Sequence, residues 1–228
     1  MMDMNIKQLN LGANHLYIAA FGALTILLSS GCSIVGISNV EEADYTVVIK
    51  DDNFELRDYE PMVVVETTID DDFENAGNKA FRRLFAYITG NNVANREIAM
   101  TAPVIADPTE MSNGMDIAMT APVVQEYSKG GWRYAFVLPA DFTLETAPKP
   151  LADNVKLAKV DGKKVAVIQY SGFWSEENMQ DKTSELNEWI SSNNLISLSE
   201  PRWAGYNPPW TIPFFRRNEV LIDVQQGK

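Results

Sequence analysis

Several short segments alternate apolar and polar residues with a period of two. Such alternation predicts strands that bury one face and expose the other. A proline or a glycine near the ends of several segments supplies the turns between them. The segments predicted as strands are 45–50, 54–59, 62–69, 132–139, 155–160, 164–170, 202–206 and 219–224.

Two other segments show the period of an amphipathic helix. The first covers about 73–88 and places one basic cluster opposite its apolar face. The apolar face consists of Phe73, Ala76, Ala80, Phe81, Leu84, Phe85 and Ile88, and the opposite face of Asn78, Lys79, Arg82 and Arg83. The second covers about 175–193, with Met179, Leu186, Trp189 and Ile190 on its apolar face.

One octapeptide occurs twice, as IAMTAPVI from Ile98 and as IAMTAPVV from Ile117. Each copy alternates like a strand but contains a proline, which cannot donate to a strand ladder. We therefore expect two bent strands that direct Met100 and Met119 towards the interior.

A second, larger repeat appears when the chain is compared with itself at a constant offset. YITGNN at Tyr87 then coincides with WISSNN at Trp189, and the 63–65 region coincides with 165–167. This predicts an internal duplication of hairpin–helix–hairpin units, roughly 45–125 and 132–225. The expected fold is α+β, in which a distorted antiparallel β-barrel is flanked by two helices.

The N-terminus predicts export and lipid attachment. An uncharged run, LYIAAFGALTILL, precedes SSGC and resembles a signal-peptide core followed by a bacterial lipobox. We expect residues 1–31 to be a signal peptide, 32–44 an acylated Cys32 and a tether, and 45–226 the folded domain. Ser33 favours the outer membrane of a bacterial cell envelope. An uncleaved anchor helix is the alternative.

Composition excludes several kinds of chemistry. Cleavage before Cys32 removes His15, the only histidine, and Cys32 is the only cysteine. The mature chain therefore has no internal disulfide, no zinc site of His and Cys, and no catalytic triad that uses histidine. The formal net charge of −12 argues against nucleic acid as a partner.

Three stretches resemble the SOUL/haem-binding protein family. They are YITGNN, IAMTAPV and the long C-terminal block RWAGYNPPWTIPFFRRNEVLIDV, and the similarity covers about residues 45–225. The resemblance implies a duplicated, distorted β-barrel with two helices. It also implies non-covalent binding of haem or another tetrapyrrole in a hydrophobic groove beside the first helix.

The resemblance also indicates which side chains to test as a ligand site. Without a mature histidine, any iron contact must come from Met, Tyr, a carboxylate or water, or be absent. Basic residues would pair with the propionates. The candidates for haem binding are Lys79, Phe81, Arg83, Leu84, Met100, Met119, Tyr206 and Trp210. The same residues also fit ordinary helix core, solvated basic surface or methionine packing.

Two other functions remain open from the sequence. A small-molecule hydrolase of the GyrI-like type would use a carboxylate such as Glu66 or Glu126 to activate water. A ligand-free envelope interaction protein would keep the fold alone. No catalytic residue and no metal ligand is assigned.

Overall fold

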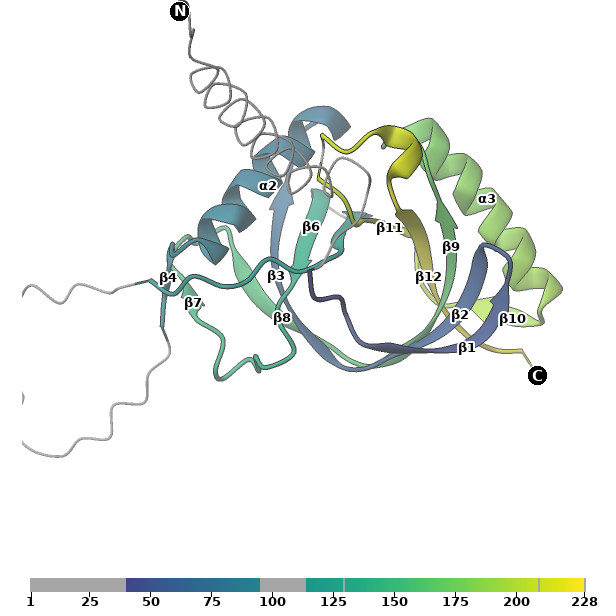
Figure 1. Ribbon diagram of the computed structural model, residues 1–228, viewed down its shortest axis with the longest axis horizontal. Coiled ribbons are helices and arrows are strands. Elements are labelled where there is room, and N and C mark those ends of the chain that lie inside the picture. Colours follow the sequence, from purple (N-terminus) through teal and green to yellow (C-terminus); the bar gives the residue numbers. More distant parts are fainter. Residues whose placement is uncertain (1–39, 95–113, 129, 209, 228) are drawn as a thin grey trace, which may run out of the picture.

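The computed structural model describes residues 40–94, 114–128, 130–208 and 210–227 of the chain (Figure 1). It is an α+β fold, as the sequence predicts. The helices are α2 (Phe73–Ile88) and α3 (Glu176–Ser192), with a 3₁₀ turn η1 (Pro213–Phe215). The strands are β1 (Tyr45–Asp51), β2 (Phe54–Tyr59), β3 (Met62–Ile69), β4 (Asn92–Val93), β5 (Val123–Ser128), β6 (Gly131–Val137), β7 (Lys149–Pro150), β8 (Lys156–Val160), β9 (Lys163–Tyr170), β10 (Leu195–Ser197), β11 (Arg202–Gly205) and β12 (Asn218–Gln226).

One large antiparallel sheet organises the domain, in the order β1-β2-β9-β12-β11-β5-β6-β3-β8, with β10 added to β12. The sheet curves strongly, so that its two ends approach each other (Figure 1). Its edge strands β1 and β8 pair with β2 and β3 but not with each other, and the sheet is therefore open. The predicted barrel is corrected in this respect: the described residues form a curved sheet that does not close.

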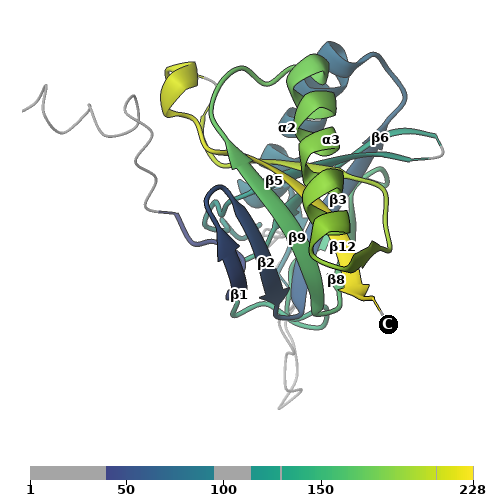
Figure 2. The same ribbon diagram turned by 90° about the vertical axis from the view of Figure 1, so that its right-hand side faces the viewer.

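Both helices cover the convex face of the sheet (Figure 1, Figure 2). Helix α2 packs on β3 and β6, and α3 packs on β9, β10 and β12. Each helix buries small and branched side chains against the outward-facing residues of those strands, which gives two separate cores. The concave face carries smaller apolar clusters together with charged side chains.

The elements reproduce the long-range repeat of the sequence. At the offset that places Tyr87 on Trp189, β2, β3 and α2 coincide with β8, β9 and α3. Each helix begins with a side-chain cap, since Asp72 accepts from the amide of Asn75 and Ser175 from that of Asn178. The same local signals therefore produce the same strand–strand–helix unit twice.

The prediction of a strand for the second octapeptide is wrong. From Ile117 to Ala121 the chain forms one isolated bridge, between Ala121 and Glu42, and only the last two residues of the octapeptide belong to β5, which begins at Val123. The hydroxyl of Thr120 donates to the carbonyl of Val137 and the amide of Ala121 to that of Glu41, while Pro122 has no amide hydrogen to donate. These contacts replace a strand ladder.

The predicted inward direction of Met119 is also wrong, since 42% of this residue is exposed. The first octapeptide, including Met100, lies outside the described residues.

The segment from Val40 to Asp44, predicted as part of the tether, is attached to the domain at several points. Glu42 forms a parallel bridge with Ala121, and the amide of Glu60 donates to the carbonyl of Asp44 at 3.0 Å. No helix among the described residues is long and apolar enough to cross a membrane. Cys32 and the apolar run before it lie outside the described residues.

Candidate functional site

Helix α2 has an apolar inner face and a partly apolar outer flank. Ala80, Leu84 and Tyr87 are almost fully buried against β3 and β6. Phe81 and Phe85, in contrast, are 41% and 40% exposed. The two rings stack with centroids 5.6 Å apart and an interplanar angle of 14°. An exposed pair of stacked rings is a platform on which a flat aromatic ligand can lie.

The platform is continuous with the strand beneath it. The ring of Phe81 meets the buried ring of Phe136 on β6 edge-on, with centroids 5.7 Å apart. Val137, the last residue of β6, follows Phe136, and its carbonyl accepts a hydrogen bond from the hydroxyl of Thr120. Met119, the residue before Thr120, therefore lies near the end of β6. Met119 is exposed there, at the end of the strand on which Phe81 packs through Phe136.

A second methionine lies where α2 ends. The amide of Ile117 donates to the carbonyl of Ile88 at 2.7 Å, so residues 114–119 leave from the C-terminal end of the helix. Met115 is 39% exposed and is fixed by a hydrogen bond from its amide to the side chain of Asn92.

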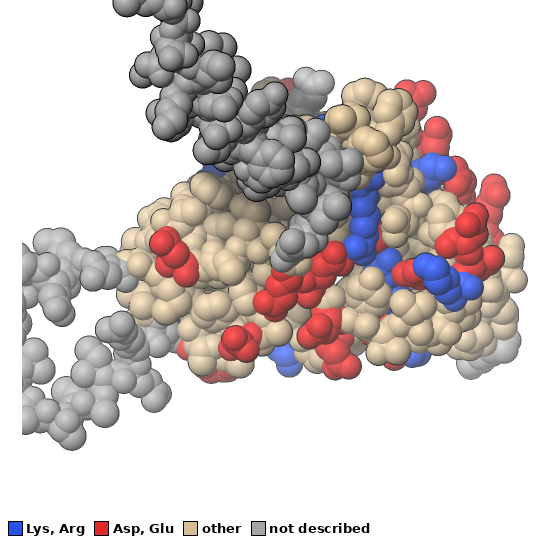
Figure 3. Space-filling model, viewed as in Figure 1, with Lys and Arg blue, Asp and Glu red and all other residues tan. Residues whose placement is uncertain are grey.

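We name these side chains the α2 surface: Phe81, Phe85, Met115 and Met119, with Phe136 beneath. Most of the visible face over α2 carries no charged side chains (Figure 3).

The two predicted basic residues, Lys79 and Arg83, lie on the flank of α2 that faces away from the aromatic pair. Lys79 forms an ion pair with Asp71 in the turn before the helix. Arg83, four residues on, donates to Thr67 and Thr68 of β3 at 3.4 and 3.5 Å. Residues four apart share a flank, so Lys79 and Arg83 lie together, on the flank opposite the aromatic pair.

Arg82 is better placed than either. It lies three residues before Phe85 on the exposed side of the helix, and its Nε donates to the carbonyl of Asn78 at 3.2 Å. No ion pair found among the described residues involves Arg82. A guanidinium beside the aromatic pair is positioned to meet a carboxylate of a ligand that lies on it.

The remaining predicted residues are not brought together. Leu84 is fully buried in the core under α2, and Tyr206 is buried in a polar network on the concave face. Trp210 is 67% exposed, on the loop between β11 and β12. Of the eight predicted ligand residues, Phe81 and Met119 are therefore exposed on the α2 surface, and Met100 lies outside the described residues.

Two hollows lie among the described residues away from the α2 surface. One, of about 490 Å³, lies between residues 41–44, the β2–β3 turn and residues 139–145, and Glu41, Glu60 and Glu145 are among its lining residues. This acidic lining would repel the propionates of a haem. The other, of about 140 Å³, lies on the concave face.

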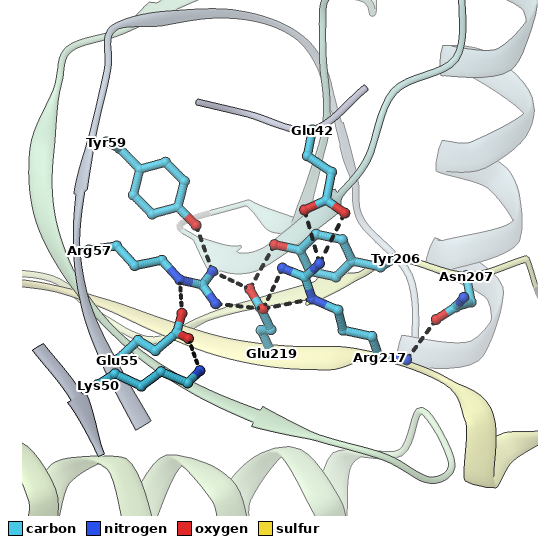
Figure 4. A network of polar contacts seen from close by, with 9 residues as sticks. All are labelled: Glu42, Lys50, Glu55, Arg57, Tyr59, Tyr206, Asn207, Arg217 and Glu219. Carbon is cyan, nitrogen blue, oxygen red and sulfur yellow. Dashed lines mark hydrogen bonds and ion pairs between the residues drawn. The ribbon is translucent and has the colours of Figure 1, made fainter. Parts of the chain in front are cut away.

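A buried network of charged side chains crosses the concave face (Figure 4). Arg57 on β2 is 1% exposed and binds Glu219 on β12 through both terminal nitrogens, at 2.8 and 2.9 Å. Its Nε donates to Glu55 at 2.7 Å, and Nη1 donates to the hydroxyl of Tyr59 at 3.0 Å. Burial alone would lower the pKa of Arg57, but the hydrogen bonds and charge of Glu219 outweigh it and raise that pKa. Burial raises the pKa of Tyr59 to about 12.

The same network reaches the N-terminal segment. Glu219 also accepts from the hydroxyl of Tyr206 at 2.7 Å and from Arg217 at 2.9 Å. Arg217 in turn donates to both carboxylate oxygens of Glu42 at 3.0 Å and lies 3.7 Å from the ring centre of Tyr206. The carboxylates and guanidinium groups neutralise one another, so the arrangement joins strands and leaves no unpaired charge for a ligand.

The carboxylates considered for hydrolysis both bind one arginine. Arg133 on β6 donates from Nε to Glu66 at 2.8 Å and from Nη1 to Glu126 at 2.7 Å. A general base needs a free lone pair directed at a substrate proton. In this structure the two carboxylates accept from a guanidinium instead. The described residues contain no group of three or more metal-binding side chains.

Comparisons with known proteins agree with this fold. The chain is 26% identical over 172 residues to "Heme-binding protein 2" of Homo sapiens. The aligned region covers 75% of this chain and 77% of the relative. It is 23% identical over 168 residues to "Heme-binding protein 1" of Xenopus tropicalis, covering 73% of this chain and 81% of the relative.

Two solved structures share the fold at lower identity. The C-terminal domain of EcmrR has a TM-score of 0.52 at 11% identity, covering 80% of this chain and 98% of that domain. A hydrolase from Listeria innocua has a TM-score of 0.51 at 13% identity, covering 78% and 94%. These two show the fold alone. The profile of the SOUL heme-binding protein family matches residues 40–223. The chain belongs to the SOUL heme-binding protein family.

Proposed function

We propose that this protein binds haem or a related tetrapyrrole on the α2 surface, without a histidine ligand to the iron, and is held at a bacterial membrane through an acylated Cys32. The observation that carries the proposal is the exposed stack of Phe81 and Phe85 in a chain of the SOUL heme-binding protein family. A macrocycle lying on the stack would cover the exposed methionines beside it.

Apolar burial is the main source of affinity in this proposal. If the ligand covers about 200 Å² of apolar surface, the gain is about 5 kcal/mol on the protein side alone, before the cost of association. Arg82 adds a charge-assisted hydrogen bond to one propionate. Together these contributions support micromolar binding without a strong iron–protein bond.

Two soft donors on this chain would be available to a haem iron at the α2 surface. Met115 and Met119 are exposed at the edge of the α2 surface, and a thioether is an established axial ligand in haem proteins. No histidine follows His15 in the sequence. We therefore propose that ligation, where it occurs, is by methionine or water, and that it adds little to the affinity.

The membrane tether is supported by the sequence. The lipobox-like SSGC ends at Cys32, and the first attached residues of the domain are 41–44. A chain acylated at Cys32 would keep the domain close to a bilayer in the cell envelope, which we propose to be the outer membrane.

Titration with haem and with metal-free protoporphyrin IX tests the function. A saturable Soret shift at one equivalent, with affinities for the two ligands that agree within about tenfold, is expected because burial of the ring dominates. Unsaturable binding of both ligands would contradict the proposal. Binding of haem with no binding of the metal-free ring would contradict the claim that iron ligation is secondary.

A further inference from the structure

The loop between β11 and β12 exposes an unusual number of large apolar side chains. Trp210, Ile212, Phe214 and Phe215 are 67%, 42%, 79% and 51% exposed, and we name residues 210–215 the aromatic loop. Phe173 in the neighbouring β9–α3 connection is 64% exposed. Contiguous apolar side chains at the surface of a folded protein indicate a contact with another apolar body.

Hydrogen bonds hold the aromatic loop in this conformation. The amides of Thr211, Phe215 and Arg216 each donate to the carbonyl three residues earlier, at 2.9 to 3.1 Å. The amide of Gly172 donates to the carbonyl of Pro213 at 2.9 Å and so fixes the loop to the β9–α3 connection. The apolar side chains are therefore presented by an ordered backbone, which reduces the entropy lost when they are covered.

The aromatic loop lies beside the point where the N-terminal segment reaches the domain. Arg217, two residues after Phe215, binds Glu42 at 3.0 Å. Figure 2 shows the loop, in yellow, and the start of β1 on the same side of the molecule. The chain from Cys32 to Val40 can span at most about 28 Å. A lipid anchor at Cys32 would therefore keep this side of the domain close to the bilayer.

We infer that the aromatic loop inserts into the interfacial region of the membrane to which the chain is tethered. The inference rests on the proposed tether. Tryptophan is favoured at the boundary between lipid headgroups and chains, and phenylalanine is favoured below it. The strength of such a contact scales with the apolar area that is buried at the boundary between headgroups and acyl chains.

Charge does not drive this contact. The chain carries a formal net charge of −12, and Glu176 and Glu177 begin α3 close to Phe173. Attraction to anionic lipids is therefore excluded as the main contribution, and burial of the aromatic rings takes its place. Insertion is expected to be equal in zwitterionic and moderately anionic vesicles and to persist in high salt.

The experiment measures quenching of Trp210 fluorescence by lipids with brominated chains. Full-length protein is reconstituted in vesicles of phosphatidylethanolamine and phosphatidylglycerol, and wild type is compared with Trp210→Phe. The wild type is expected to be quenched several-fold more than the variant, because the other tryptophans are more buried than Trp210. Equal quenching of the two proteins would overturn the inference.

A second pair of variants separates insertion from mere proximity. Phe214→Ser combined with Phe215→Ser is expected to remove most quenching of Trp210, whereas Tyr127→Ser, at the exposed β5–β6 hairpin, is expected to leave it unchanged. Unchanged quenching in the double variant would overturn the inference. So would loss of haem binding in this double variant while it remains folded, because the loop would then belong to the tetrapyrrole site.

The tether is tested separately. Mass spectrometry shows whether Cys32 is acylated. The depth of Trp210 in the bilayer is measured on the protein that co-floats with the vesicles in a density gradient. An unmodified Cys32 with deep quenching would refute the tether alone, and an acylated Cys32 with no quenching would refute the insertion alone.

Discussion

Arg57 and Glu219 form a buried, bidentate ion pair between β2 and β12, reaching over β9, which lies between these two strands in the sheet. The side chains are 1% and 0% exposed. If one partner is lost, the charge of the other remains buried and cannot be solvated. Arrangements of the strands that separate Arg57 from Glu219 are therefore disfavoured.

Replacement of Arg57 by methionine is therefore expected to lower the free energy of unfolding by about 3 kcal/mol or more, since it leaves a buried carboxylate short of a partner. Lys164→Met is the matched control, because Lys164 and Asp58 form an ion pair at 2.7 Å in which both side chains are about half exposed. That variant is expected to cost about 1 kcal/mol at most. Urea unfolding measures both, and equal losses would contradict the account.

Acid is expected to destabilise the fold by protonating partnered carboxylates. Burial would raise the pKa of Asp223, but Arg202 and Lys163 outweigh it and hold that pKa below its usual 3.8. Glu55 behaves similarly: Lys50 and Arg57 outweigh burial and keep its pKa below 4.5. A lowered folded-state pKa stabilises the fold above the unfolded value, and this stability is lost as pH falls through the folded value.

The unfolding free energy is thus expected to show no change from these groups between pH 6 and 8 and to fall below about pH 4.5. Asp223→Asn should lower stability at pH 7 and make the acid decline shallower. Denaturant unfolding of wild type and of Asp223→Asn between pH 3 and pH 8 measures both effects. An Asp223→Asn variant with the wild-type decline would show that Asp223 does not contribute.

Leu84 separates core packing from ligand contact. It is fully buried under α2, so Leu84→Ala is expected to cost about 2 to 5 kcal/mol of stability through the cavity it leaves. Its effect on the haem dissociation constant, measured where the variant remains folded, is expected to be small. Strong loss of haem affinity with unchanged stability would place Leu84 in the ligand site.

Charge reversal on the two flanks of α2 is expected to affect haem binding differently. Arg82→Glu is expected to weaken haem binding by about tenfold, because a carboxylate would face a propionate beside Phe85. Lys79→Glu is the control, because Lys79 pairs with Asp71 on the other flank. This variant is expected to leave haem binding unchanged. The Arg82→Glu effect should vanish with haem dimethyl ester, whose propionates are uncharged. Persistence of the effect with the ester would contradict the assigned role.

Local signals in the sequence predict much of the fold. The period of 73–88 gives the bounds of α2, and the alternation of 155–160 and 164–170 predicts β8 and β9 to within one residue. The second octapeptide has the alternation of a strand as well, yet its polar groups bond to Val137 and Glu41. That outcome depends on tertiary neighbours, which no local pattern contains.

The site was less predictable for a related physical reason. Leu84 and Phe81 belong to the same predicted apolar helix face, yet Leu84 is buried against the sheet and Phe81 is 41% exposed, because the packing partners of the helix come from strands distant in the sequence. Arg57 was missed altogether. Glu55, Arg57 and Tyr59 alternate along β2, so the sequence places three polar side chains on one face of this strand. The pairing of Arg57 with Glu219 depends on the strand order, which the local pattern does not contain.

The most direct test of the account is haem titration of a Phe81→Ser, Phe85→Ser double variant beside wild type and Tyr127→Ser. We predict saturable one-to-one binding by wild type and by the hairpin control, and a loss of at least about tenfold in affinity in the double variant, because the removed rings are the platform for the macrocycle. Wild-type affinity in a folded double variant would contradict the claim that this protein holds its ligand on the α2 surface.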